Sequence, residues 1–98
     1  MEETAQKIKN FLDADKRLVS YPAKRKSRMW ALRYLAEKME PERIYTEKEL
    51  AELLNGWHTF GDPATLRREL YDYRFIGRDL SGRGYWLERE QPSPEEWE

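Results

Sequence analysis

The stretch DPATLRRELYDYR, residues 62–74, carries the strongest folding signal in this chain. Asp62 can accept hydrogen bonds from the free amides of a first helical turn, so it is a good N-cap. Pro63 suits the next position, where its missing N–H costs nothing and its fixed φ helps the helix to begin. The sequence therefore predicts a short helix with a sharply defined start.

This helix has two different sides at about 100° per residue. The apolar side holds Leu66, Leu70 and Tyr73, and the opposite side holds Ala64, Arg68 and Tyr71, with Arg67 and Asp72 flanking it. We expect the apolar side to pack on a core and the cationic, aromatic side to be presented. That arrangement is typical of a recognition helix.

The 98 residues suffice for one domain, and no apolar run approaches the roughly 20 residues of a membrane span. The polar start, Met1 to Thr4, lacks the basic flank and apolar core of a signal peptide, so we expect a cytoplasmic protein without a membrane partner. Cysteine is absent and His58 is the lone histidine, which argues against zinc or a cysteine nucleophile. We expect no cofactor, no metal and no enzymatic activity, with His58 making a loop hydrogen bond.

The formal charge of -1 argues against a strongly basic nucleic-acid-binding surface, but the charges are unevenly distributed. Residues 16–36 include seven bases and no acid, whereas residues 90–98 carry four glutamates and no base. The bases are Lys16, Arg17, Lys24, Arg25, Lys26, Arg28 and Arg33. We therefore expect a mildly basic body with its charge gathered in patches.

The elements around the capped helix follow in a recognisable order. We predict a helix over residues 2–12, a second from Pro22 or Ala23 to Met39, and a third from Thr46 to Gly56. Thr46 has capping-box spacing to Glu49, which supports the start of the third helix. Short strands are predicted over residues 43–45, 75–78 and 85–89. The fold class is mainly α with a small β-hairpin (α+β), a winged helix-turn-helix with an extra N-terminal helix. Residues 1–89 would form this single domain, and residues 90–98 an acidic, disordered tail.

Several segments resemble the bacterial family catalogued as domain of unknown function 2087. The similar segments are residues 11–12, 16–18, 21–26, 45–49, 64–70, 72–73 and 84–86, so the resemblance covers about residues 11–87. It implies a small winged-helix-like domain that occurs alone or fused to helix-turn-helix regulators, without an established activity. Arg74 stands where a glycine is common in that family.

We expect a nucleic-acid-binding module, with DNA as partner, of a bacterial transcriptional regulator. Thr65, Arg67, Arg68 and Tyr71 would meet the groove, Lys24, Arg25, Lys26 and Arg28 the phosphates, and Arg78 and Arg83 would reach from the wing. The ordinary alternatives are a solvated basic run, an Arg68–Asp72 pair, and packing of Tyr71.

A different class of function is a winged helix that binds a protein partner, and RNA binding comes third. Acidic Glu47, Glu49 or Glu52 lying across the basic face would favour the protein partner. A continuous basic face that joins the capped helix to the Lys24 patch would favour nucleic acid.

Overall fold

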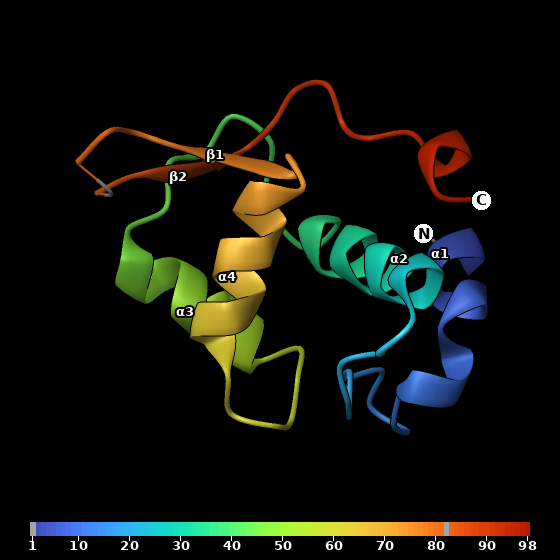
Figure 1. The fold of residues 1–98 in the computed structure, drawn as a ribbon. Helices are drawn as coiled ribbons and strands as arrows, with labels where there is room; N and C mark the ends of the chain where they lie inside the picture. Colours follow the sequence, from blue (N-terminus) through green and yellow to red (C-terminus); the bar gives the residue numbers. More distant parts are fainter. Residues whose placement is uncertain (1, 82) are drawn as a thin grey trace.

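The computed structural model describes residues 2–81 and 83–98. These residues form a small α+β domain whose helices precede an antiparallel hairpin (Figure 1). The elements are α1 (Glu2–Lys7), the 3-10 turn η1 (Lys9–Phe11), α2 (Arg25–Ala36), α3 (Glu47–Asn55), α4 (Pro63–Asp72), β1 (Ile76–Arg78), β2 (Tyr85–Leu87) and the 3-10 turn η2 (Pro94–Glu96). The predicted fold class is confirmed.

The starts of α3 and α4 follow the capping signals in the sequence. Thr46 accepts a hydrogen bond from the amide of Glu49 at 3.0 Å, and the Glu49 carboxylate accepts one from the amide of Thr46 at 2.9 Å. Asp62 accepts one from the amide of Thr65 at 3.2 Å, and Pro63 is the first residue of α4. Both predicted N-caps are therefore confirmed.

The end of α4 depends on a left-handed residue. Arg74 has a φ of 70°, its amide donates to the Tyr71 carbonyl at 3.0 Å, and the amide of Phe75 donates to the Leu70 carbonyl at 2.9 Å. These two bonds define a Schellman motif, in which the left-handed position usually holds glycine. The helix ends two residues earlier than the predicted Arg74, and the chain turns there into β1.

The hairpin pairs Ile76 with Leu87 and Arg78 with Tyr85 in antiparallel register. Only Tyr45 remains of the predicted first strand, and it forms an isolated bridge to Tyr85, with N–O distances of 2.7 and 2.8 Å. The order α2, Tyr45, α3, α4 and hairpin is the element order of a winged helix. Gly82, in the predicted turn, lies outside the described residues.

The long helix α2 is shorter than predicted at both ends. Lys24 is extended at the N-cap, with a ψ of 136°, and the helix begins at Arg25. After Ala36 the chain continues in a tighter turn, because the amides of Lys38 and Met39 each bond to a carbonyl three residues back. The N-terminal segment also divides, into α1 and the turn η1, where one helix over 2–12 was predicted.

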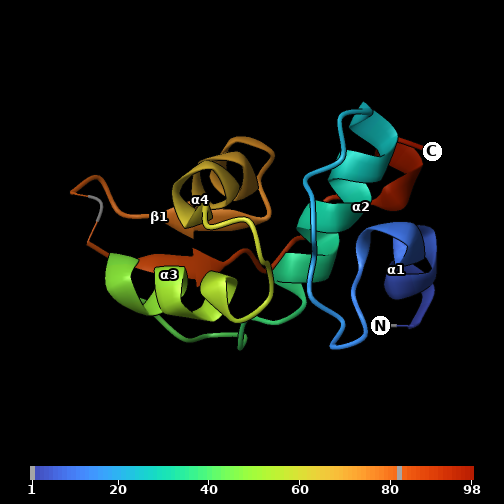
Figure 2. The ribbon, with the colours of Figure 1, turned by 90° about the horizontal axis from the view of Figure 1, so that it is seen from below.

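The core is formed by α2, α3, α4 and the hairpin, together with buried residues of the N-terminal segment. Its largest fully buried side chains are Trp30, Tyr45, Phe75, Ile8, Leu18, Leu32, Leu35, Leu50, Leu54, Leu66, Leu70 and Ile76. Figure 2 shows α3, α4 and the hairpin as one group, with α1, α2 and the C-terminal turn as a second group beside it. The two sides predicted for α4 are confirmed, since Leu66 and Leu70 are buried while Arg68 and Tyr71 are exposed.

Residues 90–98 are a correction to the prediction of a disordered tail. The segment returns to the body, and the side chain of Trp97 is only 7% exposed. Ser93 caps the turn η2, and Glu98 accepts a hydrogen bond from the indole of Trp30 at 2.5 Å. Lys7 of α1 lies 3.8 Å from the Glu98 carboxylate, so the two ends of the described chain meet over α2 (Figure 1).

Candidate nucleic-acid interface

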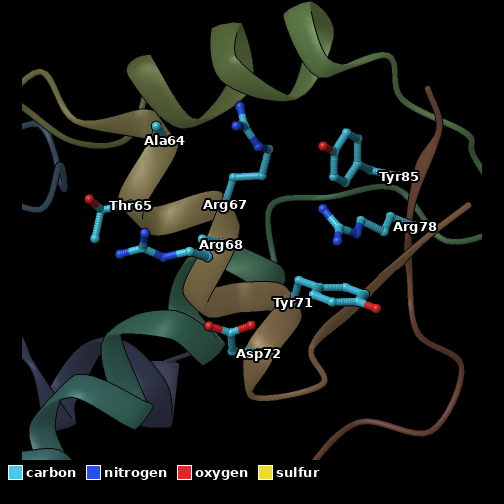
Figure 3. Close-up of a pocket in the computed structure, with 8 residues that line it drawn as sticks. All are labelled: Ala64, Thr65, Arg67, Arg68, Tyr71, Asp72, Arg78 and Tyr85. Carbon is cyan, nitrogen blue, oxygen red and sulfur yellow. The ribbon is translucent and has the colours of Figure 1, made fainter. Parts of the chain in front are cut away.

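The outer side of α4 and the start of the wing enclose a shallow hollow of about 380 Å³, here called the α4 hollow. Its lining residues are Ala64, Thr65, Arg67, Arg68, Tyr71, Asp72, Arg78 and Tyr85 (Figure 3). Five of the ten predicted contact residues therefore come together here. Most of the lining residues belong to α4, while β1 contributes Arg78 and β2 contributes Tyr85.

Two arginines of the hollow lie over tyrosine rings. The guanidinium carbon of Arg78 lies 4.6 Å from the ring centroid of Tyr71, and that of Arg67 lies 5.8 Å from the centroid of Tyr85. A guanidinium over an aromatic face keeps its charge and loses conformational freedom before any ligand arrives. Tyr71 thus packs against Arg78 of the wing, which was the alternative to its contact with nucleic acid. It also remains 39% exposed beside the hollow.

Arg67 is less open than the sequence suggested. Its side chain is 23% exposed, and its Nη1 lies 3.7 Å from the carboxylate of Glu47, the first residue of α3. Figure 3 shows Arg67 extending toward α3, away from Arg68. An acidic residue therefore does reach this face, which was the feature expected to favour a protein partner.

Arg68 is the openly presented cation of α4. It is exposed, and the described part of the chain offers it no ion pair, so the alternative Arg68–Asp72 pair is not found there. The hydrogen bond that the Asp62 carboxylate accepts from Thr65 lowers the pKa of Asp62, and the charge of Arg68 adds a smaller effect in the same direction. Arg68 is thus free to meet an anion from solution.

The basic patch at the start of α2 divides into free and engaged residues. Lys24 and Arg25 are exposed and have no ion pair within residues 2–81 and 83–98. Lys26 lies 3.4 Å from the Glu98 carboxylate. Arg28 lies 3.8 Å from Glu69 of α4 and is therefore used inside the molecule.

Arg28 belongs to a joint between α2 and α4. It donates to the Pro22 carbonyl at 3.0 Å and lies 4.5 Å from the ring centroid of Tyr21, whose hydroxyl donates to the Glu69 carboxylate. Burial, and then the hydrogen bond to Glu69, raise the pKa of Tyr21 well above its usual range. This joint connects the first turn of α2 to α4 through side chains. Sequence reasoning missed it, because nothing local links Tyr21 to Glu69.

His58 holds the turn between α3 and α4. It is 3% exposed, its Nδ1 lies 2.6 Å from the Leu54 carbonyl, and its Nε2 accepts from the amide of Asp62 at 2.9 Å. These partners require a neutral ring with its proton on Nδ1. The predicted loop hydrogen bond is confirmed, and its effect is to fix the N-cap of α4.

The wing contributes Arg83 outside the α4 hollow. Its side chain is exposed, and its amide donates to Asp79 Oδ1 at 2.9 Å.

Within the described ranges, no group of three or more histidine, cysteine or acidic residues is placed to bind a metal ion. None of the helices in the described residues has the length and apolar character needed to cross a membrane.

The fold and site define a small α+β domain that presents a cationic helix beside a hairpin. The chain belongs to the family described as "Uncharacterized protein conserved in bacteria (DUF2087)", whose model matches residues 17–87. The match includes α2, α3, α4 and the hairpin, and leaves out α1 and the turn η2. No curated protein and no solved structure matches the chain.

Proposed function

We propose that this protein is a nucleic-acid-binding module, with duplex DNA as its target, that serves in bacterial transcription regulation. The observation that carries the proposal is the α4 hollow, where Arg68, Tyr71 and Arg78 share one open face of a capped helix and its adjoining wing. A helix presented in this way fits the major groove in size, and arginine is the commonest side chain to read guanine there.

Each part of the surface has a separate role in the proposal. Arg68 donates to a base edge, and Thr65, Arg67 and Arg78 meet the flanking phosphates. Lys24 and Arg25 contact the backbone on the α2 side of α4, and Arg83 contacts it from the wing. Lys26 joins them on leaving Glu98, while Arg28 supports the surface from within by holding Glu69.

Fluorescence anisotropy tests the proposal with random duplex DNA, single-stranded DNA and RNA over a salt series. We expect duplex DNA to bind best, and Arg68→Ala or Arg78→Ala to weaken it. Arg89→Ala is the matched control, because the Arg89 side chain is 90% exposed beyond β2 and does not line the α4 hollow. Flat curves for all three nucleic acids at low salt would refute the proposal, and a preference for RNA would change the target.

The second candidate is a protein partner docked on the same face. The contact between Glu47 and Arg67 favours it, because a carboxylate at this edge repels phosphate and accepts hydrogen bonds from a peptide. The net charge of -1 points in the same direction. This alternative would be established by two results together. Nucleic acids would cause no change in anisotropy, and a protein partner would bind the Arg89→Ala variant but not the Arg68→Ala variant.

A further inference from the structure

Glu47 is the one acidic residue of α3 that the structure places against Arg67. It is not needed to cap its own helix, because the capping box of α3 consists of Thr46 and Glu49. Its side chain is 62% exposed, so it reaches Arg67 from the solvent side of the surface. A negative charge at a helix N-terminus is mildly favourable, yet this alone does not require the approach to Arg67.

We infer that Glu47 is an internal competitor for the anion that Arg67 would bind. This inference rests on the proposed function and deepens it, since it names the residue that limits the affinity of the site. Tyr85 lies beneath the Arg67 guanidinium, which is therefore held in place and not merely flexible at the surface. In the free protein the Glu47 carboxylate is paired with the Arg67 guanidinium, and a phosphate that binds Arg67 must displace Glu47.

The salt dependence of binding gives this competition a distinct signature. When a phosphate replaces Glu47, the freed carboxylate stays nearby and offsets the charge of Arg67, so that binding releases about one counterion fewer from the DNA. Removing the carboxylate should steepen the slope of log K against log salt by about 0.9. The affinity advantage of Glu47→Gln should then grow about threefold as salt falls from about 200 to about 50 mM.

A double-mutant cycle separates this local competition from a general change of charge. The four proteins are the wild type, Glu47→Gln, Arg67→Gln and the double variant, measured by anisotropy with random duplex DNA. Glu52→Gln is the matched control, because Glu52 is an exposed acid of the same helix and, among the described residues, Arg67 pairs with Glu47 and not with Glu52. We expect Glu47→Gln to tighten binding in the wild type and to lose most of that effect in the Arg67→Gln background.

The inference is overturned if Glu47→Gln and Glu52→Gln tighten binding equally, or if the gain from Glu47→Gln persists without Arg67. A second measurement does not depend on nucleic acid. Inorganic phosphate is titrated while the ¹⁵N signal of the Arg67 side-chain Nε is followed, and Glu47→Gln should respond at lower phosphate than the wild type or Glu52→Gln. If no nucleic acid binds but this response appears, the proposed function fails and the competition stands; equal responses overturn the competition itself.

Discussion

The indole of Trp97 meets the indole of Trp30 edge to face, with ring centroids 5.6 Å apart and planes at 87°. Phe75 lies on another side of Trp97, at a centroid distance of 6.2 Å. Trp97 therefore bridges α2 and the residue that precedes β1. The end of the described chain is part of the core, and it connects two elements that position the α4 hollow.

Replacing Trp97 by alanine should destabilise the domain by about 3 kcal/mol, because a large buried aromatic side chain would leave a cavity between Trp30 and Phe75. Urea unfolding followed by tryptophan fluorescence measures the change. Glu95→Ala is the control from the same turn, since Glu95 is exposed. Equal midpoints for the two variants would contradict the packing of Trp97.

The left-handed turn after α4 offers a stabilising substitution. Arg74 has a φ of 70°, a conformation that costs a residue with a Cβ about 1 kcal/mol relative to glycine. Arg74→Gly should therefore be about 1 kcal/mol more stable than Arg74→Ala, which retains the Cβ but not the guanidinium. Thermal and urea unfolding of the two variants check this difference. A more stable alanine variant would show that the turn is not left-handed.

Tyr21 should make the stability of the domain sensitive to alkaline pH. Its pKa is raised in the folded state above an unfolded value near 10, so its contribution is fully present below pH 10. Above that pH the unfolded state loses the proton first, and stability falls by at most about 1.4 kcal/mol per pH unit until the folded hydroxyl also ionises. Urea midpoints between pH 8 and pH 11 should show a shallower alkaline decline for Tyr21→Phe.

The control for that decline is Tyr71→Phe, because Tyr71 is exposed and lies outside the joint between α2 and α4. It should retain the steep alkaline decline of the wild type. An identical decline in Tyr21→Phe would show that the hydrogen bond from Tyr21 to Glu69 does not carry the effect.

Local signals predicted most of the fold. Thr46 and Asp62 cap helices through bonds to residues three positions later, so a short window of sequence contains both partners. The predicted disorder of residues 90–98 failed for the opposite reason. The acidic composition of that segment indicates little burial, but one side chain, Trp97, finds its partners far back in the chain.

The candidate site divides in the same way. Helical periodicity predicted which side of α4 is presented, and Arg68 and Tyr71 are exposed on it. The same periodicity cannot show that Arg67 meets Glu47 or that Arg28 meets Glu69, because those acids lie on other helices. Sequence alone therefore made all the arginines look equally free, and the tertiary contacts distinguish them.

That distinction gives a prediction for the patch at the start of α2. Lys24 and Arg25 are exposed without an ion pair in the described residues, so neutralising both should remove two phosphate contacts from a bound duplex. The slope of log K against log salt should become shallower by about 0.9 for each contact, and the stability of the fold should not change. Arg28→Ala should behave differently and lower the unfolding midpoint, because Arg28 holds Glu69 and the Pro22 carbonyl.

Anisotropy over a salt series, paired with urea unfolding of each variant, separates these effects. Lys9→Ala is the control, since Lys9 is an exposed base in η1 that is not one of the proposed contact residues. If Lys24→Ala/Arg25→Ala keeps the wild-type slope while Arg68→Ala weakens binding, the duplex meets α4 without reaching α2. The phosphate role of this patch would then be wrong, and the contact surface would be confined to α4 and the wing.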